Sequence, residues 1–286
     1  MPKYFPFTHD RRAMLKAGLV FPFMKRFEEN IMKVSLIHMK TRDSMKEIFK
    51  AVREKIHEAA EQKPDFIALP EYFSVPGFIE KFSSAAEIFK ETYTSTVEFL
   101  KDVSAELPDI YIVGGTFVEK SQNTFFNTCT IWKNSKPLGT YRKRNLINIE
   151  TKIGISKGDK PLVLPTEFGK IGVLICADIF NGEAVKQTVS LGAEVIFLPV
   201  ASLSTHPDVK GHPLSEKIAL ENGVFIVKIG NVRSDAKGGR SAVVAPWGVI
   251  EEASESPSDV VLTVELDMQK LRSYRRGINR GFSTHQ

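Results

Sequence analysis

The sequence predicts an α/β fold with mixed sheets and helices on the outside. The chain begins with a strand–helix–strand order, because apolar runs at 33–39 and 65–73 flank residues 44–63, where apolar side chains recur at helical spacing. Short strands then follow one another closely, as in PLVLP (161–165) and KIGVLIC (170–176). Many short strands between helices indicate two sheets packed face to face.

The other expected elements support the same class. Apolar spacing predicts a helix over 84–106, and alternation predicts a strand over 126–132. The stretch NSKPLG has the composition of a turn. The remaining expected elements are a strand at 109–117, a helix at 182–191, a strand at 194–201, a helix at 215–223, strands at 224–231, 241–246 and 260–266, and a closing helix at 268–277.

Composition narrows the class of protein. The 286 residues are 42% hydrophobic and 26% charged, which is typical of a soluble globular chain able to bury a large core. The two cysteines, Cys129 and Cys176, are too few for a disulfide framework or a zinc site, so we expect a reducing, cytoplasmic location.

Residues 1–31 are expected to be an N-terminal extension, and residues 32–286 the catalytic domain. The extension carries six Lys/Arg and three Asp/Glu, which is +3 of the net charge of +5. Its apolar stretch is broken by Pro22, lacks a small-residue cleavage site and is too short to span a bilayer. The rest of the chain has no basic run interleaved with aromatics, so we expect neither a nucleic-acid nor a membrane partner.

Three polar residues, Glu71, Lys143 and Cys176, stand at or next to the ends of strand-like runs. Each alone has a commoner explanation: a solvated glutamate, a surface lysine, a core cysteine. Together, a carboxylate could take the thiol proton and an ammonium could stabilise an oxyanion, with an amide carbonyl as the electrophile.

The order and wording of these segments resemble the nitrilase, or carbon–nitrogen hydrolase, superfamily. Seven blocks carry the resemblance: ALPEYF, FNTCTIW with Asn127, GTYRKRNL, GVLICAD, EVIFLPVA, SEKIALENGVFIVKIGNV and GGRSAVVAPWG. The resemblance implies a four-layer α-β-β-α sandwich of two mixed sheets. It also implies a homodimer or a larger homo-oligomer and no metal or organic cofactor.

The same resemblance assigns roles to individual residues. Glu71 is expected as the general base, Lys143 as the oxyanion stabiliser and Cys176 as the nucleophile, with the backbone N–H of Ala177 completing the oxyanion site. Many members have a second glutamate, for which Glu150 is the candidate. A surface position for Glu150 and a second-glutamate role for Glu119 both stay open.

Some positions differ from the residues that are commoner in the family. Asn145 stands where a histidine often follows the lysine block, Ala177 replaces an aromatic residue or Glu, and Phe180 replaces an arginine, although Glu183 fits the acidic position beyond it. These changes leave the substrate open. Asp178 is expected to support the turn through backbone hydrogen bonds. Cys129, on an alternating strand, is expected in the core.

Rival motifs are weaker. GISKG matches G-x-S-x-G around Ser156, but no buried strand precedes it and no helix follows it, as a nucleophile elbow requires. His206 and His212 have a spacing that fits no common metal site, so a loop that borders the pocket is expected. Arg240 could bind a carboxylate, although a surface role is the simpler interpretation.

We therefore expect a thiol-dependent hydrolase that cleaves a non-peptide C–N bond in a small linear amide or N-carbamoyl compound. The alternatives are a non-catalytic or binding protein on the same fold, acyl transfer to an acceptor other than water, and hydrolysis of nitriles.

Overall fold

The computed structural model describes residues 30–201, 212–232, 240–253 and 258–282. The predicted boundary at Met32 between an extension and a catalytic domain stays a prediction, because residues 1–29 lie outside this part. Strand β1 (Ile31–Lys40) starts at the beginning of the described region.

Strand β1 joins the two halves of a curled sheet. It runs parallel to β2 (Phe66–Ala68), antiparallel to β14 (Val260–Asp267), and pairs at its end with β11 (Phe225–Val232). The hydrogen-bonded path is β4-β5-β3-β2-β1-β11-β10-β9-β8.

The half that contains β2 also holds strands from the middle of the chain: β3 (Tyr111–Val113), β4 (Phe117–Ser121), β5 (Thr124–Lys133), β6 (Lys136–Arg142) and β7 (Ile155–Ser156). The half that contains β11 holds β8 (Leu162–Thr166), β9 (Gly169–Val173), β10 (Val195–Val200), β12 (Ser241–Ala245) and β13 (Gly248–Ala253).

The two halves pack face to face, as the sequence predicts. The ring of Phe66 on β2 lies 5.4 Å from that of Phe197 on β10 and 6.0 Å from that of Phe168, the residue before β9. These side chains belong to one apolar core, shared by both halves. The contact between strands from opposite halves establishes the two inner layers of the sandwich.

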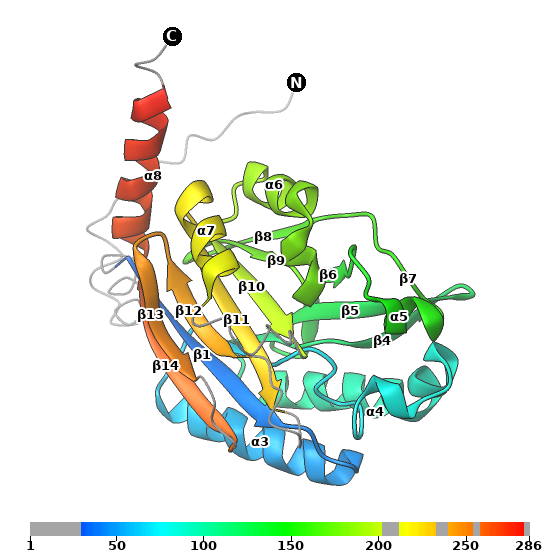
Figure 1. Ribbon diagram of the computed structural model, residues 1–286. Coiled ribbons are helices and arrows are strands. Elements are labelled where there is room, and N and C mark those ends of the chain that lie inside the picture. The colour runs from blue at the N-terminus through cyan, green and yellow to red at the C-terminus, as the bar shows by residue number, and fades with distance from the viewer. Residues whose placement is uncertain (1–29, 202–211, 233–239, 254–257, 283–286) are drawn as a thin grey trace, which may run out of the picture.

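Helices cover the two outer faces. Helices α3 (Met45–Glu61) and α4 (Ala85–Glu106) pack on the β2 half, where their apolar side chains form a second core with Ile37, Ile67 and Ile112. Helices α6 (Gly182–Ser190) and α7 (Pro213–Asn222) cover the other half, and α8 (Met268–Phe282) follows β14. Figure 1 shows α3 and α4 on the lower side of the sheet and α6 and α7 on the upper side. This arrangement confirms the predicted α-β-β-α sandwich.

The helix starts follow from local chemistry. Ser44 and Ser84, each in extended conformation, accept hydrogen bonds from the backbone N–H groups of Glu47 and Glu87. Such caps satisfy backbone donors that the first turn leaves without partners.

The predicted turn over NSKPLG is shorter in the structure. Asn134 and Ser135 both have positive φ and form a two-residue hairpin turn, so β6 already begins at Lys136. Hairpin turns of this kind match the twist of the strands they join. The shorter turn lets β6 pair with β5 up to Arg142, which places Lys143 at the strand end.

Candidate active site

Four of the predicted site residues meet in one buried cluster, defined here as Glu71, Lys143, Glu150 and Cys176. Glu71 follows β2, Lys143 follows β6, Glu150 lies in the short helix α5 (Asn148–Lys152), and Cys176 starts the 3₁₀ helix η2 (Cys176–Phe180) after β9. None is more than 3% exposed. The sheet edges thus bring together side chains that lie far apart in the sequence.

Lys143 is the centre of this buried cluster. Its Nζ lies 2.8 Å from Glu71 Oε1 and 2.8 Å from Glu150 Oε2. The Cys176 thiol is coupled to Glu71, because each of the two groups shifts the pKa of the other. The ammonium and the thiol are therefore both partners of the same carboxylate.

The two glutamates differ in how fully protein donors surround them. Glu150 accepts hydrogen bonds from Tyr72 Oη at 2.7 Å and Asn127 Nδ2 at 2.8 Å on Oε1, and from the Ile147 N–H at 3.0 Å on Oε2, besides Lys143. A carboxylate offers about four acceptor positions, so protein donors occupy all of them.

Glu71 keeps room for the thiol. Its Oε1 accepts from Asn127 Nδ2 at 2.9 Å and from Lys143, and its Oε2 accepts from the Ala201 N–H at 2.9 Å. The Glu71 carbonyl accepts from Asn231 Nδ2 at 2.7 Å. The fourth acceptor position of the carboxylate is therefore available to Cys176, which suits a base for that thiol.

Burial and charge set the proton affinities of the buried cluster. Burial raises the pKa of Glu71, and the Lys143 charge opposes this rise. Burial also raises the pKa of the Cys176 thiol well above its usual value, and Glu71 raises it further. Burial lowers the pKa of Lys143, but the negative charges of Glu71 and Glu150 contribute to raising it above the ordinary value. The thiol at rest is thus neutral, beside a base and a fixed cation.

The turn that carries Cys176 is held by Asp178. Cys176 has a φ of 45°, which is uncommon for a residue with a side chain. Asp178 accepts hydrogen bonds from the Ile175 and Asn145 N–H groups at 3.0 and 2.6 Å. It also accepts from the Arg144 N–H at 3.0 Å and from Tyr141 Oη at 2.8 Å. These bonds bear out the predicted supporting role of Asp178.

Three contacts of the buried cluster were not foreseen as functional features: Tyr72 Oη, the Ala201 N–H and the amide of Asn127. The sequence offered two indirect signals: Tyr72 is adjacent to Glu71, and Asn127 lies in one of the family-like blocks. Tyr72 has a φ of 52°, a left-handed conformation that no sequence pattern predicted.

The other candidates lie apart from the buried cluster or play a structural part. Glu119 is paired with Arg142 at 2.7 Å and accepts from Thr128. Ser156 is half-buried in the two-residue strand β7, and Cys129 lies in the core as expected. Ala177 is 5% exposed beside Cys176, whereas Phe180 is 64% exposed.

The two predicted loop histidines are placed only in part. His206 lies outside the described residues. His212 is buried directly before α7, where its Nε2 lies 3.1 Å from Glu252 Oε2 and its Nδ1 lies 3.5 Å from Lys228 Nζ. Arg240 is half-buried. Within the described ranges, no group of three His, Cys, Asp or Glu side chains could hold a metal ion, and no helix is long and apolar enough to cross a bilayer.

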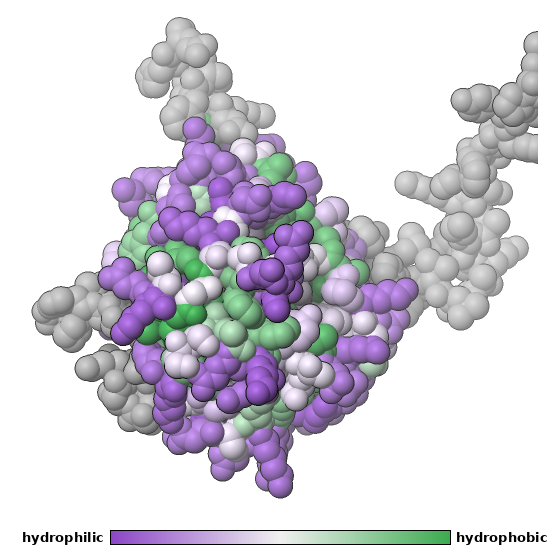
Figure 2. Space-filling view, turned by 90° about the vertical axis from the view of Figure 1, so that its right-hand side faces the viewer, coloured by the Kyte–Doolittle hydropathy of each residue, from purple (hydrophilic) through white to green (hydrophobic). Residues whose placement is uncertain are grey.

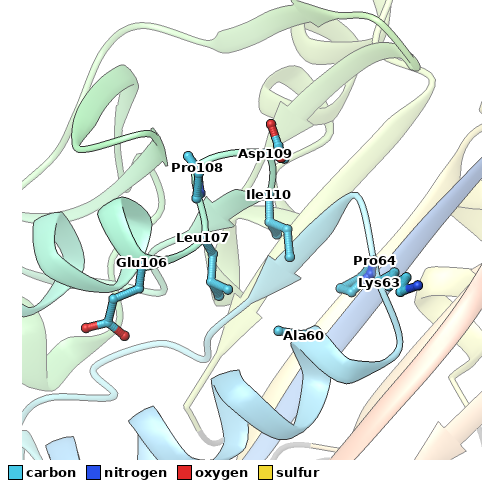
Figure 3. A pocket seen from close by; sticks show the side chains of 8 residues that line it. All are labelled: Ala60, Lys63, Pro64, Glu106, Leu107, Pro108, Asp109 and Ile110. Atoms are coloured by element: carbon cyan, nitrogen blue, oxygen red, sulfur yellow. The ribbon is translucent and has the colours of Figure 1, made fainter. Parts of the chain in front are cut away.

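Two hollows on the described surface lie away from the buried cluster. The hollow in Figure 3, of about 340 Å³, is lined by residues at the ends of α3 and α4, among them Pro64 and Leu107, and by no member of the buried cluster. Figure 2 shows the side that carries α5 and β7 in Figure 1, with hydrophobic residues among hydrophilic ones. Ile147, directly before α5, is 42% exposed.

Comparisons with known proteins identify the family of this chain. The model of the carbon-nitrogen hydrolase family matches residues 33–276. Omega-amidase NIT2-B of Xenopus laevis is 30% identical over 239 residues, which cover 78% of this chain and 84% of that protein.

Two solved structures share the fold. Nit3 of Saccharomyces cerevisiae, described as a member of branch 10 of the nitrilase superfamily, has a TM-score of 0.74 and 24% identity, over 87% of this chain and 94% of that one. A mutant amidase from Nesterenkonia sp. AN1 has a TM-score of 0.70 and 21% identity, over 88% and 97% of the two chains. That structure shows covalent addition of the acetamide moiety of fluoroacetamide at the active-site cysteine. The family match spans most of the chain, and this protein belongs to the carbon-nitrogen hydrolase family.

Proposed function

We propose that this protein is a thiol amidase in which Cys176 is the nucleophile, Glu71 the general base and Lys143 the oxyanion stabiliser. The observation that carries the proposal is the position of Lys143 Nζ, 2.8 Å from the Glu71 carboxylate, which raises the pKa of the nearby Cys176 thiol. An ammonium and a carboxylate around a single thiol supply proton transfer and charge stabilisation together.

The reaction has two halves. In the first, the Cys176 proton passes to Glu71 while sulfur bonds to the carbonyl carbon, and the oxyanion that forms is stabilised by Lys143 and the Ala177 N–H. The C–N bond then breaks, and the leaving nitrogen takes the proton from Glu71, so that ammonia or an amine departs and a thioester remains. In the second half, water gives a proton to Glu71 and attacks the thioester. The C–S bond breaks, the acid leaves, and the thiol regains its proton.

We assign Glu150 an electrostatic role. With protein donors on all its acceptor positions, Glu150 has no free lone pair for a substrate proton. Its charge adds to that of Glu71 in keeping Lys143 protonated. In this assignment Glu150 does not contact the amine of the substrate directly.

The substrate class we propose is a small linear amide or an N-carbamoyl compound. The relative named an omega-amidase and the amidase that accepts an acetamide group on its cysteine support this class. A non-catalytic role fits the buried cluster poorly, because burying two carboxylates around one ammonium is costly and such groups concentrate at functional sites.

The test is ammonia release from a panel of small amides and carbamoyl compounds by wild type, Cys176→Ala and Cys129→Ala. Cys129 is the matched control, since it is equally buried but lies in the core. We expect release by wild type and Cys129→Ala only. Substantial release by Cys176→Ala would refute the mechanism. Nitriles and added hydroxylamine in the same panel distinguish nitrile hydrolysis and acyl transfer from amide hydrolysis.

We also propose a homodimer in the cytoplasm. Exposed hydrophobic side chains at the ends of α6 and α7, Leu191 and Leu220, support a protein partner, with exposed fractions of 48% and 52%. The two free cysteines support a reducing compartment. Sedimentation velocity of wild type and a Leu191→Glu/Leu220→Glu variant tests the dimer; a monomeric wild type would contradict it.

A further inference from the structure

Asn127 touches three of the four residues of the buried cluster. It lies on β5 with no exposed surface. Its Nδ2 donates to Glu71 Oε1 at 2.9 Å and to Glu150 Oε1 at 2.8 Å. Its backbone carbonyl accepts from the Lys143 N–H at 2.8 Å. One residue therefore contacts two carboxylates and the backbone of the lysine, which belong to three separate segments.

The orientation of this amide follows from its acceptors. Ionised carboxylates only accept hydrogen bonds, so the NH₂ end of Asn127 must face the two glutamates. One nitrogen with two N–H groups can serve two carboxylate oxygens at once. A serine or threonine would supply a single donor, and an aspartate would add a third carboxylate.

We propose that Asn127 is a positioning residue of the reaction, which holds the Glu71 and Glu150 carboxylates on the two sides of Lys143 and keeps the base Glu71 ionised. This inference rests on the proposed function. Two carboxylates that share an ammonium repel each other, and the neutral donor between them offsets that repulsion without adding a second cation.

Loss of the Asn127 donors has a consequence for pH dependence. The titratable or charged groups that act on Glu71 or are affected by it come from several elements: Tyr72 after β2, Lys143 after β6, Glu150 on α5 and Cys176 on η2. Two further groups act at one remove, since Asp178 on η2 interacts with Lys143 and Lys228 on β11 interacts with Cys176. Among these, only Lys143 lies within hydrogen-bond distance of both carboxylates in the described structure. Without the amide, Glu71 takes up a proton more readily, and less of it is available as base near neutral pH.

The experiment compares Asn127→Leu and Asn127→Asp with Thr128→Val. Thr128 is the next residue on β5, equally buried, and donates to Glu119 outside the buried cluster. For each protein we would measure thermal unfolding, kcat and KM against pH, and the rate at which iodoacetamide alkylates Cys176 against pH, with the alkylated site located by mass spectrometry.

For a folded Asn127→Leu we expect kcat to fall by about 100-fold with KM changed by less than about threefold, within the range for lost acid–base function. The acid limbs of both pH profiles should move upward by about one unit. The aspartate side chain has the same shape as asparagine, and in Asn127→Asp we expect kcat to fall at least as much. This variant therefore tests the inference if Asn127→Leu does not fold. Thr128→Val should keep the wild-type profiles.

Unshifted acid limbs in both Asn127 variants, or the same shift in Thr128→Val, would overturn the inference. The alkylation profile needs no substrate. If wild type hydrolyses no compound, the proposed function fails, whereas the alkylation profiles still decide whether Asn127 sets the protonation of the buried cluster.

Discussion

Asn145 Nδ2 donates a hydrogen bond of 2.7 Å to the carbonyl oxygen of Ala177. Asn145 lies two residues after Lys143, and Ala177 directly follows Cys176. The bond therefore joins the segment that presents the cation to the turn that presents the thiol. Asp178 strengthens the same link, because it accepts from the Arg144 and Asn145 N–H groups.

Asn145→Ala should lower activity more than it lowers stability. We expect a loss of about 1 kcal/mol in the free energy of unfolding, which is typical of one hydrogen bond, and about a tenfold lower kcat. The matched control is Asn222→Ala, which removes a similar bond of 2.9 Å to the Ile218 carbonyl, on α7. Urea unfolding and steady-state kinetics measure both effects; equal kcat values for the two variants would contradict the link.

Asp178→Asn should destabilise the fold. Four donors face this carboxylate, so an amide nitrogen in place of one oxygen would set donor against donor in a buried site. We expect a loss of about 3 kcal/mol in the free energy of unfolding. Asp43→Asn is the control, because Asp43 is 81% exposed and pairs only with Lys81 in the described structure, and we expect it to change stability by less than about 0.5 kcal/mol. Similar unfolding midpoints for both variants would refute this account of the turn.

Lys143→Met should change the pH dependence of whatever activity remains. Burial raises the pKa of Glu71, and the Lys143 charge holds it down. Without that charge the Glu71 pKa rises further, so the base ionises only at a higher pH, and the acid limb of kcat/KM should move upward. Lys133→Met, which removes a lysine paired with Glu167, should leave the limb in place. A downward shift in Lys143→Met would contradict the electrostatics described here.

Lys228→Met should stabilise the protein near neutral pH. Burial lowers the pKa of Lys228 to about 8, and its side chain is near His212, whose pKa burial lowers to about 4. Below pH 8 the folded protein holds a buried ammonium, whereas between pH 8 and about 10.5 only the unfolded chain keeps this proton. The wild-type free energy of unfolding should therefore rise with pH across that window.

The gain from Lys228→Met should be on the order of 2 kcal/mol at pH 7 and should shrink as the pH rises above 8. Lys217→Met on α7, where the side chain is 66% exposed, is the control and should show no such trend. Urea unfolding at pH 7 and pH 9 measures the difference. A variant less stable than wild type at pH 7 would show that Lys228 contributes favourable interactions instead.

Periodicity carried most of the fold prediction. The helices α3 and α4 have long apolar faces, and β10 is a continuous buried run, so both kinds of element were readable from residue spacing. The family-like motifs ALPEYF, YRK and LICAD then predicted that Glu71, Lys143 and Cys176 would meet. The structure brings these three residues together. Their catalytic roles stay a prediction.

Other features depend on contacts that spacing does not encode. Helix α5 has only five residues, too few for a periodic pattern, and the burial of Glu150 comes from Tyr72, Asn127 and Lys143 on distant segments. The burial of Lys228 could not be predicted either. A lysine within an apolar strand suggests an exposed position, and the sequence does not show that His212, directly before α7, packs against it. The short turn before β6 required two residues with positive φ, neither of them glycine.

The central claim is that Cys176 forms a thioester with the acyl part of a small amide. Intact-mass spectrometry of wild type and Cys176→Ala, after incubation with the panel of amides and carbamoyl compounds, tests it most directly. We expect a mass gain equal to an acyl group on wild type alone. The same mass gain on Cys176→Ala would contradict the claim. So would an acyl group found on a residue other than Cys176 in wild type that releases ammonia.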